Sequence, residues 1–131
     1  MYIHRALEQP ILRASEQFPV LLVTGPRQVG KTTLLRHLCG NERRYVTLDD
    51  LAIRDLANED PVLFLQRYPS PVLVDEIQYA PNLLSYIKME VDAARKPGAF
   101  WLTGSQHFHM MKGVTESLAG RVAIVNLLGL S

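Results

Sequence analysis

The fold of this chain is decided by the stretch Val20-Leu21-Leu22-Val23-Thr24-Gly25-Pro26-Arg27-Gln28-Val29-Gly30-Lys31-Thr32. Its first five residues form a largely apolar run, which is typical of a strand buried on both faces of a parallel sheet. Its last eight residues match the pattern G-x-x-x-x-G-K-[S/T], which joins a strand to a helix. The following residues predict that helix from Lys31 to Leu38, with Gly40 as its stop signal.

The rest of the chain alternates short apolar runs with stretches of helical period. Further strands are predicted at residues 44–48, 71–76, 99–103 and 122–125. Further helices are predicted at residues 51–57, 60–68, 84–94 and 108–118, with Asp49-Asp50 able to cap the first of them. Strands separated by helices indicate an α/β fold with a parallel sheet, in which ligands bind outside the carboxyl ends of the strands.

Length and composition indicate one ordinary globular domain over residues 1–131, with 47% hydrophobic and 21% charged residues. The formal net charge of +1 gives no support for nucleic acid or a membrane as an obligatory partner. No apolar run reaches the length of about 18 residues that a spanning helix needs. The chain has one cysteine, Cys39, expected to be a small buried hydrophobe, so no disulfide framework exists and a cytoplasmic location is expected.

The residue types in the loop pattern suit a phosphate-binding site. Gly25 and Gly30 allow backbone conformations that side chains forbid, so that N–H groups converge on a phosphate at a helix N-terminus. Lys31 would reach the β- and γ-phosphates of ATP, and the Thr32 hydroxyl would bind Mg²⁺. The alternative is a ligand-free turn, which would not require Lys31-Thr32. The candidate nucleotide-binding residues are Gly25, Pro26, Arg27, Gln28, Val29, Gly30, Lys31, Thr32 and Thr33.

Two adjacent carboxylates, Asp75 and Glu76, end the predicted strand at residues 71–76. Asp75 would contact Mg²⁺ directly or through water, and Glu76 would orient or deprotonate the water that attacks the γ-phosphate. The alternative is an acidic cap on the following loop. A P-loop kinase or a GTPase would not need Glu76, and the guanine-reading pattern Asn-Lys-x-Asp is absent, so the pair favours hydrolysis of ATP.

Two other polar residues lie beside predicted strands: Ser105 follows the strand at 99–103, and Arg121 directly precedes the strand at 122–125. Ser105, after the strand at 99–103, could bind the γ-phosphate or the attacking water, or belong to a plain turn. Arg121 could stabilise transition-state charge in a neighbouring subunit, or pair with a carboxylate. His107 and His109 have no neighbouring cysteine or carboxylate at metal-ligand spacing and are interpreted as surface histidines.

With these residues in place, the chain resembles the AAA+ ATPases of the additional-strand glutamate class of P-loop NTPases. It is most similar to prokaryotic AAA-domain proteins, and the likeness covers nearly the whole chain. Four motifs carry it in the same order: GPRQVGKTTLL at residues 25–35, DEIQ at 75–78, LTGS at 102–105 and SLAGR at 117–121.

The resemblance implies a five-stranded parallel sheet in the order 5-1-4-3-2. It also implies a role for each matched residue: Lys31 and Thr32 as Walker A residues, Asp75 and Glu76 as the Walker B pair, Ser105 as a sensor-1 candidate, and Arg121 as an arginine-finger candidate. Relatives continue into a helical lid and a C-terminal domain, whereas this chain ends at Ser131. We therefore expect the N-terminal ATPase portion of a longer protein.

The leading functional hypothesis is an ATPase module whose Mg-dependent hydrolysis of ATP drives a conformational switch in an attached domain or a homo-oligomer. A second is a nucleotide-binding module with little turnover on its own. A third is a nucleic-acid-associated ATPase, for which the charge balance gives no support.

Overall fold

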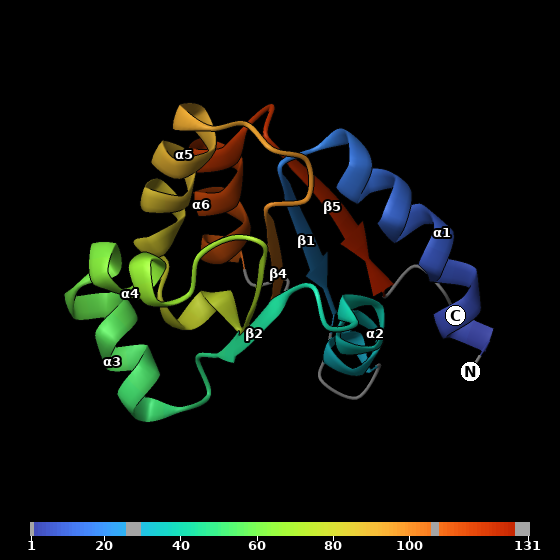
Figure 1. The fold of residues 1–131 in the computed structure, drawn as a ribbon, viewed down its shortest axis with the longest axis horizontal. Helices are drawn as coiled ribbons and strands as arrows, with labels where there is room; N and C mark the ends of the chain where they lie inside the picture. Colours follow the sequence, from blue (N-terminus) through green and yellow to red (C-terminus); the bar gives the residue numbers. More distant parts are fainter. Residues whose placement is uncertain (1, 26–29, 106–107, 128–131) are drawn as a thin grey trace.

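A parallel sheet of five strands forms the centre of the molecule (Figure 1). The computed structural model describes residues 2–25, 30–105 and 108–127. The strands lie in the order β2-β3-β4-β1-β5, which is the predicted order 5-1-4-3-2 counted from the other edge. The predicted fold is therefore confirmed. The strands are β1 (Val20–Thr24), β2 (Arg44–Thr47), β3 (Val72–Asp75), β4 (Phe100–Gly104) and β5 (Val122–Asn126).

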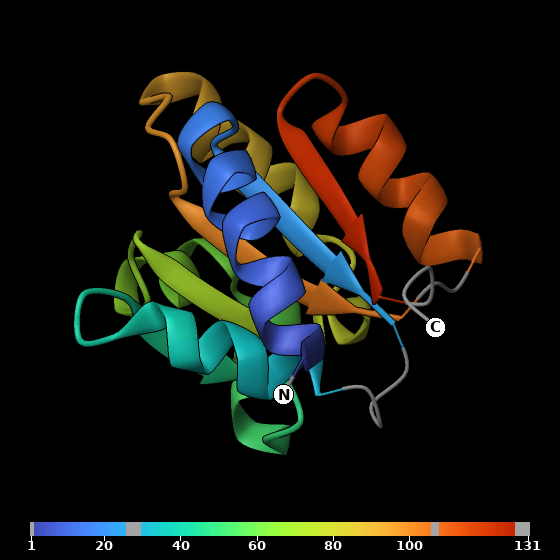
Figure 2. The ribbon, with the colours of Figure 1, turned by 90° about the vertical axis from the view of Figure 1, so that its right-hand side faces the viewer.

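Helices cover both faces of the sheet, α1 and α2 on one face and α3 to α6 on the other (Figures 1 and 2). Among the described residues, no helix combines the length and the apolar character that crossing a membrane requires. The helices are α1 (Tyr2–Gln17), α2 (Lys31–Cys39), α3 (Leu51–Glu59), α4 (Pro61–Arg67), α5 (Leu83–Ala93) and α6 (Phe108–Leu118), with a 3₁₀ turn η2 (Ile77–Tyr79) after β3.

Strand β1 shows why the central strands are apolar throughout. Successive side chains of a strand point to opposite faces. Val20 and Leu22 therefore pack into the core under α3 to α6, whereas Leu21 and Val23 pack into the core under α1 and α2. All four side chains are fully buried, because a strand between two helical layers has no face in contact with water.

Helix α1 was not predicted from the sequence. It carries Pro10 in its interior, and an internal proline removes a backbone hydrogen bond and disfavours a helix. The helix nevertheless docks on the sheet, where Ile11 is fully buried and the Trp101 indole N–H donates to Ser15 Oγ at 2.9 Å. The stability gained by packing against the sheet thus outweighs the unfavourable effect of Pro10 on the helix.

One predicted detail is wrong. The strand at 71–76 ends at Asp75, because Glu76 adopts the left-handed conformation (φ 62°) and turns the chain into η2. The cap predicted from the Asp49-Asp50 pair is confirmed: Asp50 is the N-cap residue of α3, and its Oδ1 accepts from the N–H groups of Ala52 and Ile53 at 3.0 and 3.2 Å. The other predicted elements agree with the structure within one or two residues at each end.

Candidate functional site

The site lies at the carboxyl edge of the sheet, where β1 leads into α2. Two glycines bound the connecting loop, Gly25 with φ 147° and Gly30 with φ 75°, and L-residues with side chains rarely adopt these values. Gly30 lies directly before α2, so the free N–H groups of the first helical turn begin beside the loop. Pro26, Arg27, Gln28 and Val29, also predicted to bind the nucleotide, lie outside the described residues.

Lys31 is a buried cation at the first position of α2, with a relative exposure of 2%. Its Nζ lies 3.9 Å from Glu76 Oε2, and both side chains are almost fully buried. A buried ammonium without a compensating charge is costly, so Glu76 neutralises Lys31 in this structure. A lysine at the positive end of a helix dipole is an arrangement that attracts anions. Thr33, two residues on, lies in the same helical turn with an exposed side chain.

Asp75 is held by hydroxyl groups from three different elements. Its carboxylate is 4% exposed and ends β3. Because an ionised carboxylate only accepts hydrogen bonds, these donors define the orientation of both oxygens. The donors are Thr32 of α2 (2.7 Å) and Thr103 of β4 (2.5 Å) to Oδ1, and Thr47 (3.0 Å) and Tyr45 (3.2 Å) of β2 to Oδ2.

Thr103 links the two neighbouring carboxylate residues. Its hydroxyl donates to Asp75 and accepts from the Glu76 backbone N–H at 2.9 Å. Thr103 is fully buried, whereas Ser105, the residue predicted to act here, lies half-buried beyond the end of β4. The hydroxyl that contacts Asp75 from β4 is therefore that of Thr103, and the role of Ser105 stays a prediction.

Glu76 is 4% exposed and lies where the chain leaves β3. Its left-handed backbone costs a non-glycine residue about 1–3 kcal/mol, and such strained residues are concentrated at functional sites. One carboxylate oxygen faces Lys31, and the other accepts from Gln78 Nε2 at 2.7 Å. Lys31, Glu76 and Gln78 thus form one chain of contacts.

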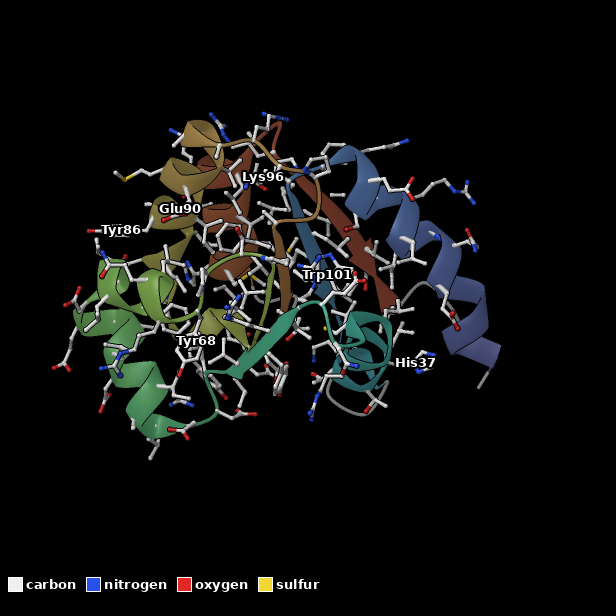
Figure 3. The ribbon with its side chains drawn as sticks, in the orientation of Figure 1. His37, Tyr68, Tyr86, Glu90, Lys96 and Trp101 are labelled. Carbon is white, nitrogen blue, oxygen red and sulfur yellow. The ribbon has the colours of Figure 1, made fainter. Side chains whose placement is uncertain are left out.

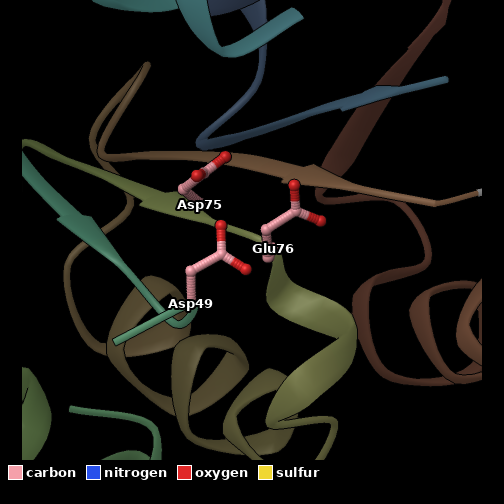
Figure 4. Close-up of side chains that lie close together, drawn as sticks. All are labelled: Asp49, Asp75 and Glu76. Atoms are coloured by element: carbon pink, nitrogen blue, oxygen red, sulfur yellow. The ribbon is translucent and has the colours of Figure 1, made fainter. Parts of the chain in front are cut away.

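A third carboxylate, Asp49, joins the pair. Asp49, Asp75 and Glu76 each have a carboxylate oxygen within 4.8 Å of the others, and we call them the acidic cluster (Figure 4). Carboxylate and hydroxyl oxygens are ligands that Mg²⁺ prefers. Because the Thr32 hydroxyl contacts the Asp75 carboxylate directly, a hydroxyl oxygen and a carboxylate oxygen lie side by side at the acidic cluster. The donor set therefore fits a magnesium ion.

The sequence did not single out Tyr45, Thr47, Thr103 or Gln78. The sequence did contain a signal for Tyr45 and Thr47, because residues two apart in a strand face the same side of the sheet. Both also lie near the carboxyl end of the predicted strand at residues 44–48. Burial raises the pKa of Tyr45, and the charge of Asp75 raises it further. The phenol consequently stays protonated at neutral pH and remains a hydrogen-bond donor to Asp75.

Arg121 lies at the opposite edge of the sheet. Its backbone carbonyl accepts from the N–H of Val20, the first residue of β1. Its guanidinium forms two bonds to Asp92 of α5, Nε to Oδ1 at 2.6 Å and Nη2 to Oδ2 at 3.1 Å. Of the two predicted possibilities, the structure shows the carboxylate pair, and it separates Arg121 from the acidic cluster of the same chain.

Three further sequence interpretations concern single residues. Cys39 is buried as predicted, and burial raises the pKa of its thiol, so the thiol stays protonated at neutral pH. His109 is exposed, as predicted for a surface histidine, and His107 lies outside the described residues.

Away from the carboxyl edge, α4 and α5 border a shallow depression on the surface. Tyr86 and Glu90, labelled in Figure 3, line it together with Val62 and Met89. The lining contains none of the residues of the acidic cluster.

The comparison with known proteins agrees with this geometry. The sequence pattern of the AAA domain family matches residues 17–131. The chain therefore belongs to the AAA domain family, and it is a nucleotide-binding module of the ATPase type.

Two curated relatives are proteins whose names carry no function. They are the uncharacterized proteins Rv2008c of Mycobacterium tuberculosis and Mb2031c of Mycobacterium bovis. Each is 39% identical over 120 residues, which is 91% of this chain but 27% of the relative. The chain thus spans about a quarter of the length of these relatives.

Proposed function

We propose that this domain binds Mg-ATP at the carboxyl edge of its sheet and hydrolyses it, so as to drive a conformational switch in an attached domain or a homo-oligomer. The observation that carries the proposal is the hydrogen bond of 2.7 Å from Thr32 to Asp75, which lies beside the buried ion pair of Lys31 and Glu76. This places a hydroxyl, two carboxylates and a cation around the start of one helix.

Residues 25–33 hold the phosphates in this proposal. The loop and the first turn of α2 offer backbone N–H groups, and Lys31 offers a positive charge. Lys31 is paired with Glu76 in this structure, so a bound γ-phosphate replaces Glu76 as its partner. That exchange frees the carboxylate of Glu76 at the moment when it is needed for catalysis.

Thr32 and Asp75 would hold Mg²⁺, which would neutralise charge on the phosphates when bound. Asp75 is already oriented by its four hydroxyl donors, so little rearrangement is needed to present it. Preorganised groups of this kind lower the free energy needed to reach the transition state.

Glu76 acts as the general base. It accepts a proton from a water molecule whose oxygen forms a bond to the γ-phosphorus. The bond between that phosphorus and the bridging oxygen breaks, and ADP leaves with the bond's electron pair. The products are ADP, phosphate and one proton. Ser105 is proposed to contact the γ-phosphate or the water.

A nucleotide-binding module with little turnover alone is the second candidate. Arg121 favours it, because this residue lies at the far edge of its own sheet and pairs with Asp92. A chain without a neighbouring copy would then lack an arginine at the transferring phosphate. No observation favours the nucleic-acid-associated alternative. We propose the cytoplasm as the location, since Cys39 is a buried thiol.

The test compares binding with turnover in two variants. Lys31→Ala is expected to weaken Mg-ATP binding by at least about 100-fold, because it removes a buried charge-assisted contact. Glu76→Gln is expected to bind Mg-ATP and to lose turnover by about 10²–10⁴-fold, the usual contribution of a general base. Calorimetry and phosphate release measure the two quantities.

Exposed residues of the same types on α6 provide matched controls. Lys112→Ala and Glu116→Gln are expected to behave like the parent chain in both assays. Equal affinity in Lys31→Ala and the parent would exclude this nucleotide site. Parental turnover in Glu76→Gln would exclude Glu76 as the base.

A further inference from the structure

Gln78 contacts Glu76 through one end of its side chain only. It lies in η2, two residues after Glu76, and its Nε2 donates to Glu76 Oε1 at 2.7 Å. The orientation of the carboxamide follows from chemistry, because a carboxylate accepts and only the NH₂ end of the amide donates. Glu76 therefore determines which way the Gln78 amide faces.

The other end of the amide has no hydrogen bond to any residue that the structure describes. Gln78 Oε1 is buried and has no hydrogen-bond partner among the described residues. A buried acceptor without a donor costs about 1–3 kcal/mol. The hydrogen bond to Glu76 is therefore made although the other end of the amide stays unsatisfied among the described residues.

Gly104 provides the space in which the amide lies. A Cβ atom at Gly104 would lie 3.2 Å from Gln78 Oε1 and 3.1 Å from Ile77 Cγ2. The amide thus rests against the end of β4, and a larger residue there would displace it. The Gln78 amide thus lies between Gly104 at the end of β4 and the carboxylate of Glu76.

The two oxygens of Glu76 consequently have different surroundings. Oε1 is bound to Gln78, and Oε2 faces Lys31, on the side where the phosphates are proposed to lie. A general base needs its accepting oxygen aimed at the reacting water and its rotation restricted. One hydrogen bond from Gln78 to Oε1 restricts that rotation while Oε2 faces Lys31.

We propose that Gln78 is a positioning residue for ATP hydrolysis, which orients the carboxylate of Glu76 by binding its Oε1. The inference rests on the proposed function, because it assigns to Glu76 the role of base. It adds a residue that acts on the reacting water only through Glu76.

The first test separates turnover from binding and from stability. Gln78→Met keeps the length of the side chain but removes both the donor and the orphaned oxygen. We expect kcat to fall by about 10–100-fold, as for other small losses of alignment. The KM and the calorimetric Kd for Mg-ATP should change by less than about threefold. The reason is that the substitution removes no contact that the proposal assigns to the bound nucleotide itself. The urea midpoint should not decrease, because a buried unsatisfied oxygen is lost as well.

A spectroscopic measurement needs no turnover. In the nucleotide-free protein, the side-chain NH₂ resonances of Gln78 in a ¹H–¹⁵N spectrum should move when Glu76→Ala removes their acceptor. The matched variant Glu116→Gln, on the exposed surface of α6, should leave them in place. Gln78→Leu, which removes the donor without adding a charge, serves as a second variant for kinetics if Gln78→Met does not fold.

The outcomes distinguish the two proposals. If Glu76→Gln abolishes turnover while both Gln78 variants keep the parental kcat, Gln78 has no positioning role and the proposed function stands. Unmoved Gln78 resonances in Glu76→Ala would also overturn the inference. If Glu76→Gln itself retains turnover, the proposed role of Glu76 fails first. A fall in kcat for Gln78→Met with an unchanged Kd and unchanged stability supports Gln78 as the positioning residue.

Discussion

At the scale of single residues, Asp75 and Glu76 are neighbours in sequence with different surroundings. Asp75 still belongs to β3 and accepts hydrogen bonds from hydroxyl groups of β2, β4 and α2. Glu76 has left the strand in a left-handed conformation and faces Lys31. A single backbone change between them separates a carboxylate suited to a metal ion from one suited to a water molecule.

Gly104 is the residue at which this arrangement is most sensitive to added volume. In Gly104→Ala the new methyl group would lie 3.0 Å from Met110 Cε and 3.1 Å from Ile77 Cγ2. We expect a loss of about 1–3 kcal/mol in the free energy of unfolding, the usual effect of overpacking. Urea unfolding followed by the fluorescence of Trp101, the one tryptophan of the chain, measures it.

Gly113→Ala is the matched control. Gly113 lies inside α6, and a Cβ there would lie 3.7 Å from Leu84 Cδ1, an ordinary contact. Replacing a helical glycine with alanine is expected to stabilise the protein by up to about 1 kcal/mol. If the two variants changed stability in the same direction, the packing of η2 and α6 against Gly104 would not be what decides the effect.

At the scale of elements, the ends of helices and strands were predictable where local chemistry determines them. Pro61 begins α4 as predicted, and the Asp60 side chain accepts from the N–H of Leu63 at 3.1 Å. Helix α1 was not predictable in this way, because its stability comes from burial of residues such as Ile11 against the sheet. The helix propensity of the residues in α1 does not include the free energy gained by that burial.

The Asp49-Asp50 pair allows a test of local capping. Asp50→Ala should lower the free energy of unfolding by about 0.5–2 kcal/mol, because it removes the acceptor of two backbone N–H groups of α3. Asp49→Ala should lower it by less than Asp50→Ala does, since Asp50 is the N-cap residue of the helix. Chemical unfolding of both variants measures the difference. Equal losses would show that the cap is shared.

At the scale of the whole molecule, the sheet separates the proposed chemistry from the arginine proposed to assist it. The acidic cluster lies at the carboxyl edge, and Arg121 lies at the amino edge beside the start of β1. Arg121 could therefore reach a transferring phosphate only in another copy of the chain. The proposed role of Arg121 thus requires an oligomer.

Mixing two inactive variants tests this requirement. The Glu76→Gln variant keeps Arg121, and the Arg121→Ala variant keeps all residues of the proposed nucleotide site. We expect each alone to lose at least about 10-fold in turnover, as for removal of an arginine finger. Mixing them should restore part of the phosphate release in a concentration-dependent way.

Asp92→Ala controls for the ion pair. It breaks the contact with Arg121 but keeps the arginine, and exposed ion pairs contribute only about 0–1 kcal/mol to stability. Turnover in Asp92→Ala should therefore stay near the parental value. A mixture no more active than its components would contradict a role for Arg121 between subunits.

The sequence by itself determined the sheet, the strand-to-helix loop at residues 25–30, and the presence of Lys31, Thr32, Asp75 and Glu76 at strand and helix ends. These features depend on local periodicity and on glycine positions, which neighbouring residues encode. The tertiary structure alone decided that Thr103 and Gln78 hold the two carboxylates and that Arg121 lies at the far edge. The contact of Thr103 with Asp75 joins strands that are adjacent only after folding, and the contact of Gln78 with Glu76 depends on the left-handed backbone turn after β3, so periodicity along the chain does not record them.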